Sequence, residues 1–249
     1  MANFDHDTVV PYKDSNLNKK GQVAEMFNDI SGKYDFLNRL LSGGIDLYWR
    51  RKALSHLKSI NPQKLLDVAT GTADVAIMAF KQLKTPSIIG IDISDGMLEF
   101  GRKKIKSLGF ENNITLHNGD SEAIKHPENA FDAVTVAFGV RNFQNLELGL
   151  SEILRVLKPG GKLVVLEFSR PKNAVVKRIY DTYMKFITPK VGHLVSNNRE
   201  AYAYLDESIR KFPEGQRFTT LMDQIGYDKP YLKTLSFGIC TIYCGSKKQ

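Results

Sequence analysis

The sequence lacks the features of membrane-spanning and secreted proteins. None of its apolar runs approaches the roughly 20 residues that a membrane-spanning helix needs, and its first residues have neither the basic nor the apolar stretch of a signal peptide. No repeat or low-complexity tract interrupts the 249 residues. We therefore expect a cytoplasmic globular protein.

Cysteine is scarce, with Cys240 and Cys244 as the only two. Residues four apart on one strand stand about 13 Å apart along one face, which is too far for a disulfide. We expect both thiols to be small buried side chains in a reducing compartment.

The sequence has fewer acidic than basic residues: 27 Asp and Glu residues against 35 Lys and Arg residues give a net charge of +8. This balance favours an anionic partner, either a nucleic acid or a membrane surface. The basic residues are scattered rather than clustered among aromatic ones, which argues against RNA. An ordinary solvated surface is the alternative explanation of the excess.

Short apolar runs alternate with amphipathic stretches over residues 62–168, the pattern of a parallel, doubly wound α/β sheet. The expected strands are residues 65–68, 88–91, 114–117, 133–137 and 163–167. The expected helices are residues 75–83, 96–108 and 146–157. A turn at residues 158–161 (KPGG) is expected to end the last helix and start the next strand.

Helical segments flank this core. Residues 22–41 predict a helix interrupted at Ser31-Gly32, and a second helix begins near Asp46. After the core we expect an aromatic-rich insertion, a helix at 218–225, and strands at 231–235 and 239–244. The chain is thus expected to be one domain of four parts: an N-terminal helical cap (1–61), a cofactor-binding core (62–170), a helical insertion that covers the substrate (171–215), and a terminal helix with a β hairpin (216–249).

A strand, a glycine-containing turn and a helix meet in residues 65–74 (LLDVATGTAD). Such a junction binds ligands at the carboxyl end of its strand, and Gly71 lets the backbone approach them closely. The dinucleotide pattern G-x-G-x-x-G is absent. Asp74 at the helix start would repel a pyrophosphate but not a sulfonium or ammonium group. The loop, with Asp67, Gly71 and Thr72 as contacts, therefore favours S-adenosylmethionine over a nicotinamide dinucleotide, and no metal is expected.

Two further acids follow neighbouring strands. Asp92 ends the second strand, where a carboxylate can accept both ribose hydroxyls; helix capping is the alternative, although Ser94 or Asp95 could cap instead. In methyltransferases an acid at the place of Asp120 hydrogen-bonds the adenine amino group, and Ser121 can add a backbone contact. An Asx turn is the alternative role for Asp120. Acids at three matching strand ends are more specific for S-adenosylmethionine than any single one.

Six further segments resemble the ubiquinone/menaquinone biosynthesis C-methyltransferases, the demethylmenaquinone methyltransferase family. They are residues 26–38 (MFNDISGKYDFLN), 49–50 (WR), 138–142 (FGVRN), 155–161 (RVLKPGG), 166–169 (LEFS) and 202–209 (YAYLDESI). The resemblance spans nearly the whole chain from about residue 21. It implies a Rossmann-like, class I methyltransferase fold with a terminal β hairpin. It also implies S-adenosylmethionine-dependent methylation of a ring carbon of a prenylated quinol, from demethylmenaquinol to menaquinol, with S-adenosylhomocysteine as the other product.

Arg141 follows the fourth strand, where methyl acceptors bind in this fold. A permanent cation there can stabilise an ionised ring oxygen, which activates the neighbouring carbon. Its own pKa, above about 12, prevents it from acting as the base, and a salt bridge to a helix end is its alternative role. Water, Tyr202, His193 and Asp35 are the candidates for the base. The catalytic candidates are Arg141, Tyr34, Asp35 and Tyr202.

The substrate-binding candidates are Asn38, Trp49, Asn142, Glu167 and His193. Tyr34, Asp35 and Asn38 share one helical face suited to closing over the cofactor, and packing of the N-terminal helices is the alternative. Glu167 is either a site residue or a buried structural carboxylate. The aromatic insertion fits an apolar lid over the ring and the start of the prenyl tail, although an ordinary helical subdomain core would look the same.

A prenylated substrate dissolved in the membrane would explain the net positive charge of the chain. Basic surface residues attract anionic lipids at about 1 kcal/mol each, so we expect weak, salt-sensitive peripheral association with the inner face of the membrane. A homodimer is left open. The alternatives are a methyltransferase of another small molecule, a sterol or RNA, a non-enzymatic scaffold of quinone synthesis, and a nicotinamide oxidoreductase. The sequence does not separate demethylmenaquinol from 2-methoxy-6-polyprenyl-1,4-benzoquinol, the substrate in ubiquinone synthesis.

Overall fold

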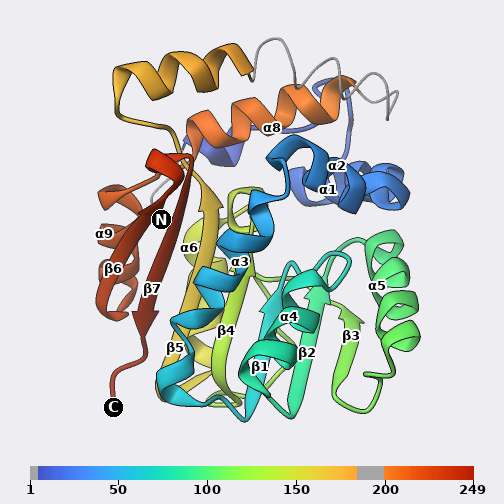
Figure 1. Ribbon diagram of the computed structural model, residues 1–249, viewed down its shortest axis with the longest axis vertical. Helices are drawn as coiled ribbons and strands as arrows, with labels where there is room; N and C mark the ends of the chain where they lie inside the picture. The colour runs from blue at the N-terminus through green and yellow to red at the C-terminus, as the bar shows by residue number, and fades with distance from the viewer. Residues whose placement is uncertain (1–4, 184–198) are drawn as a thin grey trace.

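Seven strands form a single sheet in the order β3-β2-β1-β4-β5-β7-β6 (Figure 1). The computed structural model describes residues 5–183 and 199–249. The strands β1 to β5 run parallel, whereas β7 is antiparallel to both β5 and β6. Their bounds are β1 Lys64–Val68, β2 Ser87–Asp92, β3 Ile114–Asn118, β4 Phe131–Ala137, β5 Leu157–Phe168, β6 Asp228–Leu235 and β7 Cys240–Ser246. The predicted α/β sheet with a terminal hairpin is confirmed.

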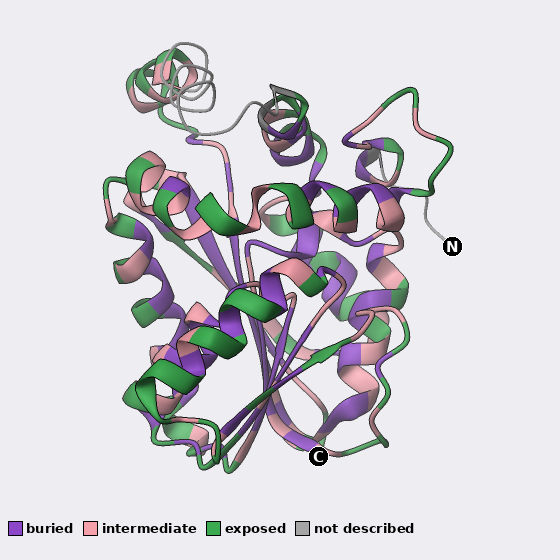
Figure 2. Ribbon diagram, turned by 90° about the vertical axis from the view of Figure 1, so that its right-hand side faces the viewer, coloured by how far each residue is buried: buried purple, intermediate pink, exposed green. Residues whose placement is uncertain are grey.

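Helices cover both faces of the sheet, so its central strands β1, β4 and β5 are buried on both sides, whereas the edge strands β3 and β6 are partly exposed (Figure 2). The side chains of β1 alternate, with Leu65 on one face and Leu66 and Val68 on the other. The first face packs against α3 (Ile45–Ser55), α4 (Asp74–Leu83) and α5 (Asp95–Leu108), and the second against α6 (Leu146–Val156) and α9 (Gln216–Ile225). Cys240 and Cys244 are buried free thiols on β7, as predicted.

The KPGG segment is not the turn that we predicted. The amide of Gly160 donates to the carbonyl of Lys247, and the amide of Lys247 donates to the carbonyl of Gly161. Together with the pairing of Leu157 to Phe131 on β4, these bonds make the segment part of β5, and the left-handed Gly160 (φ +76) lies within the irregularity between the two pairings. Backbone pairing with the C-terminal strand thus overrode the turn composition of this segment.

The helices of the N-terminal cap are interrupted at two places. Helix α1 (Lys19–Ile30) passes through the 3-10 turn η2 (Ser31–Lys33) into α2 (Tyr34–Ser42), which confirms the interruption predicted at Ser31-Gly32. Helix α2 ends at Gly43 and Gly44, both left-handed with φ of +59 and +79, and α3 follows at once. Since glycine adopts this conformation without steric cost, the chain can reverse between the two helices.

The insertion lies beyond the carboxyl ends of the strands (Figure 1). It includes a helix over residues 174–183 and α8 (Arg199–Lys211). Tyr180, Tyr183 and Tyr204 line a cavity beneath these helices, whereas Phe212 packs against Phe218 in the sheet core. Within the described ranges, the structure contains no helix long and apolar enough to cross a membrane.

Candidate functional site

Two hollows adjoin at the carboxyl ends of the parallel strands. The smaller one, the strand-end cleft, lies over the ends of β1, β2 and β4 and encloses about 60 Å³. The larger one, the apolar cavity, encloses about 560 Å³ under the helices of the cap and the insertion. Phe27, Tyr34 and Phe138 line both. The two hollows therefore share a wall that these three side chains form.

Asp92 lines the strand-end cleft and fixes its loop. Its Oδ2 accepts the amide of Gly71 at 2.8 Å, and its Oδ1 accepts the amide of Ser94 at 2.9 Å. Burial raises the pKa of this carboxyl, and these amide hydrogen bonds oppose the shift. Ser94 caps α5 by accepting the amide of Met97. Capping therefore does not need Asp92, and this half-buried residue, predicted to accept the ribose hydroxyls, lines the cleft.

Asp67 lies beneath the cleft and does not line it. Its two oxygens accept the hydroxyls of Thr70 and Thr135, each at 2.6 Å. The predicted direct contact with a cofactor therefore has no geometric support for Asp67. The carboxylate instead ties the loop after β1 to β4, which holds the backbone around Gly71 in place.

The stability of the fold should depend on the ionisation of Asp67. Burial raises the pKa of this carboxyl to about 6, so the folded chain keeps its proton at pH values where the unfolded chain has lost it. Between about pH 4 and pH 6 the free energy of unfolding should therefore fall as pH rises, by roughly 3 kcal/mol from this group. Urea unfolding of Asp67→Asn across this range should lack that component. Identical pH profiles for the variant and the wild type would contradict it.

Asp120 and Ser121, predicted to contact adenine, both line the cleft, and the carboxylate of Asp120 already has partners. Its Oδ1 accepts the amide of Glu122 at 2.9 Å, which is the Asx turn given above as the alternative. Its Oδ2 is paired with the ammonium of Lys20, which also contacts Glu122 at 3.2 Å. Lys20 belongs to α1, and its amide donates to Gln144. No spacing in the sequence could have indicated a pair separated by a hundred residues.

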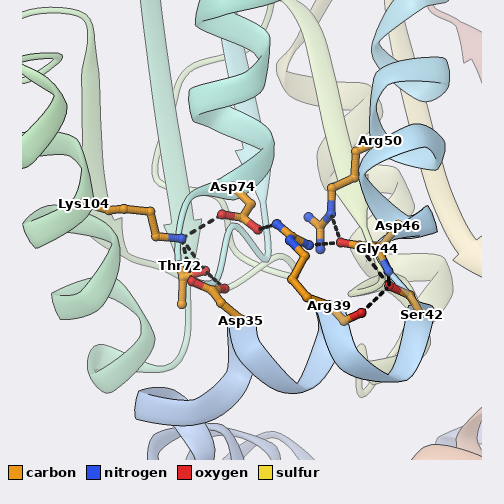
Figure 3. A network of polar contacts seen from close by, with 9 residues as sticks. All are labelled: Asp35, Arg39, Ser42, Gly44, Asp46, Arg50, Thr72, Asp74 and Lys104. Atoms are coloured by element: carbon orange, nitrogen blue, oxygen red, sulfur yellow. Dashed lines mark hydrogen bonds and ion pairs between the residues drawn. The ribbon is translucent and has the colours of Figure 1, made fainter.

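Thr72 also does not line the cleft, because its side chain belongs to a polar network (Figure 3). Its hydroxyl donates to Asp35 at 2.6 Å. The ammonium of Lys104 bridges Asp35 and Asp74, at 2.7 Å from each. Asp35, predicted as a catalytic residue, thus lines neither hollow and ties α2 to the loop after β1 and to α5.

The network continues from α4 into the N-terminal cap (Figure 3). Arg39 on α2 contacts Asp74 at 2.5 Å and is also paired with Asp46 on α3. Asp46 contacts Arg50 one turn later, at 3.4 Å. Burial tends to raise the pKa of Asp74, but the charges of Arg50, Lys104 and Arg39 together outweigh it and lower that pKa. Protein cations thus already neutralise the charge of Asp74. This charge therefore no longer favours a cationic cofactor over a pyrophosphate.

Replacing Asp74 should therefore affect folding more than cofactor affinity. In Asp74→Asn, the half-buried cations Arg39 and Lys104 each lose a charged partner, so the free energy of unfolding should fall by about 1–3 kcal/mol. The dissociation constant for S-adenosylmethionine should stay within about threefold of the wild type. Urea unfolding and calorimetric titration measure the two, with the exposed Glu99→Gln as the control. A large loss of affinity with unchanged stability would restore the direct role of Asp74.

The apolar cavity is walled by aromatic and aliphatic side chains with few polar groups. Trp49 lies on its wall, and its Nε1 donates to Ser236 at 2.8 Å. The indole packs against Phe138 and Phe168 at ring-centroid distances of 6.3 and 6.2 Å. Asn38 also lines this cavity, on α2. Both predicted substrate-binding residues thus border the larger hollow.

Arg141 reaches the cavity from the 3-10 turn η4 (Val140–Asn142) after β4. Its Nη1 donates to Glu167 at 2.8 Å and to the carbonyl of Phe138 at 2.6 Å. Its Nε is buried and has no hydrogen-bond partner among the described residues. The salt bridge that we gave as the alternative exists, but it joins a strand-end carboxylate rather than a helix end. The side chain of Arg141 nevertheless lines the cavity.

Glu167 ends β5, and its side chain is fully buried behind Arg141. Burial raises the pKa of Glu167, and the neighbouring Arg141 opposes that shift. Glu167 lines neither hollow, so its geometry is that of a residue that holds Arg141. Asn142, next to Arg141, lines the cleft instead and accepts the hydroxyl of Tyr204 at 3.0 Å. The side chain of Tyr202 and the whole of His193 lie outside the described residues.

Comparison with known proteins identifies the family. Residues 14–247 match the ubiE/COQ5 methyltransferase family. The chain is 44% identical to a demethylmenaquinone methyltransferase of Bacteroides fragilis, over 98% of this chain and 100% of that protein. It is 45% identical to a ubiquinone/menaquinone biosynthesis C-methyltransferase of Geobacter sulfurreducens, over 93% and 91% of the two chains.

A solved structure supports the fold independently. An S-adenosylmethionine-dependent methyltransferase of Thermotoga maritima superposes with a TM-score of 0.63 at 19% identity, covering 90% of this chain and 99% of the other. At that identity the likeness concerns the class I methyltransferase fold alone. The sequence relatives, which extend over the whole cap, sheet and hairpin, carry the assignment further. The chain belongs to the ubiE/COQ5 methyltransferase family.

Proposed function

We propose that this protein uses S-adenosylmethionine to methylate a ring carbon of a prenylated quinol, converting demethylmenaquinol to menaquinol. One observation carries the proposal: a large apolar cavity is lined by the cationic side chain of Arg141 and adjoins the Asp92 cleft. A quinol ring needs apolar walls and one cationic group for its oxygen. The names of the two relatives point to the same substrate class.

The residues of the strand-end cleft fit S-adenosylmethionine. Asp92 would accept the ribose hydroxyls, and Gly71, left-handed at φ +56 with open space at its Cβ position, would let the backbone approach the cofactor. Asp120 and Ser121 would face the adenine. Because the cleft encloses only about 60 Å³, Lys20 would have to swing away from Asp120 to make room. When bound, the cofactor supplies an electrophilic methyl group on a positively charged sulfur.

Arg141 would stabilise the ionised form of the quinol. Loss of a hydroxyl proton places negative charge on the oxygen and on the neighbouring ring carbon, and a fixed cation lowers the pKa of that hydroxyl. Glu167 would keep the guanidinium oriented. The ring carbon would take the methyl group as the methyl–sulfur bond breaks, and its proton would then pass to water, which restores the aromatic ring. Apolar walls help because this step neutralises charge and gains from the exclusion of water.

The experiment that tests the function is quinone analysis in a strain that lacks the protein. Accumulation of demethylmenaquinone, reversed by the gene, is the expected result. Accumulation of the unmethylated 2-methoxy-6-polyprenyl benzoquinol would instead assign the step to ubiquinone synthesis. Calorimetric titration separates the other classes, because a scaffold need not bind S-adenosylmethionine and an oxidoreductase would be stabilised by NAD.

Weak association with anionic membranes is part of the proposal, because the substrate is dissolved in the bilayer and the chain carries a net charge of +8. The protein should float with anionic liposomes at low salt and be partly released at about 0.5 M salt, where the Debye length falls to a few ångströms. Liposomes without anionic lipid are the control. No flotation at low salt would contradict it.

A further inference from the structure

Three apolar side chains border both the cavity and solvent. Ile45, Ile179 and Phe237 line the cavity, yet 40%, 67% and 84% of their respective surfaces are exposed. They come from the start of α3, from the helix over residues 174–183 and from the 3-10 turn η5 (Ser236–Gly238). A side chain in contact with both spaces stands at the opening between them. These three residues therefore define the cavity mouth.

Hydrogen bonds hold the elements of the cavity mouth together. Trp49 on α3 donates to Ser236 beside Phe237 at 2.8 Å. Tyr183 donates to the carbonyl of Leu41 on α2 at 2.8 Å, which fixes the helix over residues 174–183 to the cap. Phe237 is held at φ +56, a conformation that a phenylalanine rarely adopts. The fold thus keeps a large, mostly exposed ring in place at some conformational cost.

The apolar surface continues outward from the cavity mouth. Val175 is 68% exposed and precedes Ile179 by one helical turn, so the two side chains share the outer face of their helix. Lys172, Lys177 and Arg178 are exposed beside them. Residues 172–180 contain no acid. An exposed apolar stripe flanked by cations is the pattern of a helix that lies in a membrane interface.

We propose that the cavity mouth, with Val175, Lys177 and Arg178, is the surface that docks on an anionic bilayer. Apolar side chains at the mouth enter the acyl boundary while the cations contact anionic headgroups, so the apolar cavity opens directly into lipid. A prenylated quinol can then pass from bilayer to cavity without exposing its tail to water. A protein partner would not require the apolar lining to run through the mouth without interruption. This inference rests on the proposed function for the identity of the molecule that enters.

The test compares substituted full-length proteins on phosphatidylglycerol-containing and pure phosphatidylcholine vesicles. Ile179→Ser/Phe237→Ser should lose about tenfold or more of its partitioning onto anionic vesicles. Leu148→Ser, which alters a 44% exposed side chain on α6, is the matched control and should bind like the wild type. Wild-type protein that does not bind anionic vesicles, or equal binding by all variants, would overturn the proposal.

A second variant separates docking from the reaction. Val175→Ser/Lys177→Gln/Arg178→Gln changes only residues outside the cavity lining. It should methylate a short-chain, water-soluble quinol like the wild type and lose about tenfold in turnover of a long-chain quinol embedded in anionic vesicles. Failure of the wild type on the soluble quinol would refute the proposed function and leave the vesicle result to decide on docking. If these substitutions dissociate a dimer in sedimentation but leave vesicle binding intact, the surface is a protein interface and the proposal fails.

Discussion

Replacing Arg141 by glutamine is expected to lower kcat for quinol methylation by about three orders of magnitude, with S-adenosylmethionine affinity within about twofold of the wild type. The guanidinium lines the apolar cavity and does not line the strand-end cleft, so its loss should affect the acceptor rather than the cofactor. In an apolar cavity no water replaces the missing cation, which makes ionisation of the quinol costly. Stopped-flow or discontinuous methyl-transfer assays measure kcat, and calorimetry measures cofactor affinity.

The buried pair between Arg141 and Glu167 complicates this experiment. Removing one partner leaves the other charge uncompensated, which typically costs about 3–5 kcal/mol of folding stability. The double variant Arg141→Gln/Glu167→Gln removes both charges and is the control for folding. It should unfold close to the wild-type urea concentration and still lack turnover. Full turnover by this double variant would show that Arg141 serves the fold alone.

Replacing Asp92 by alanine should instead weaken S-adenosylmethionine binding by about a hundredfold, equivalent to ~2.7 kcal/mol. Two effects add: the cofactor loses the acceptor for its ribose, and the amides of Gly71 and Ser94 lose the carboxylate that fixes them. Under saturating cofactor, turnover should recover to within a fewfold of the wild type. Calorimetric titration and kcat at saturation measure the two effects.

Asp95→Ala is the matched control, because Asp95 is an exposed acid three residues away that does not line the cleft. Its cofactor affinity should be unchanged. The opposite pattern, in which Asp92→Ala abolishes kcat at saturating cofactor while affinity persists, would exchange the roles that we propose for the cleft and the cavity.

Much of the fold is predictable from local pattern. Short continuous apolar runs and amphipathic helices of period 3.6 indicated the parallel strands and their covering helices, since a strand buried on both sheet faces is apolar throughout. The interruption of the N-terminal helix at Ser31-Gly32 was likewise predicted from the local sequence. The KPGG segment was misjudged because its strand pairing depends on Lys247, which is distant in sequence. Local turn propensity cannot register such a partner.

The sites were predictable to different degrees. Asp92 and Asp120 were found because parallel strands place their carboxyl ends at one edge. Asp67 and Thr72 lie in the same loop, but only the packing shows that their polar atoms turn toward Thr135 and Asp35 and away from the cleft. Lys20 was missed entirely. A contact between α1 and the loop after β3 leaves no trace in the spacing of either segment.

The loop at residues 65–74 has some properties that the sequence determines and others that only the tertiary structure decides. By itself the sequence determined the strand–turn–helix at residues 65–74 and the acids that end the neighbouring strands. Its motifs also indicated the family of the chain. All of these depend on residues near one another in the chain. Only the tertiary structure decided which of these side chains line the strand-end cleft. It neutralised Asp74 with Arg39 and Lys104, buried Asp67, and set Arg141 against Glu167 at an apolar cavity. Charge pairing and burial depend on partners that the chain brings together only when it folds.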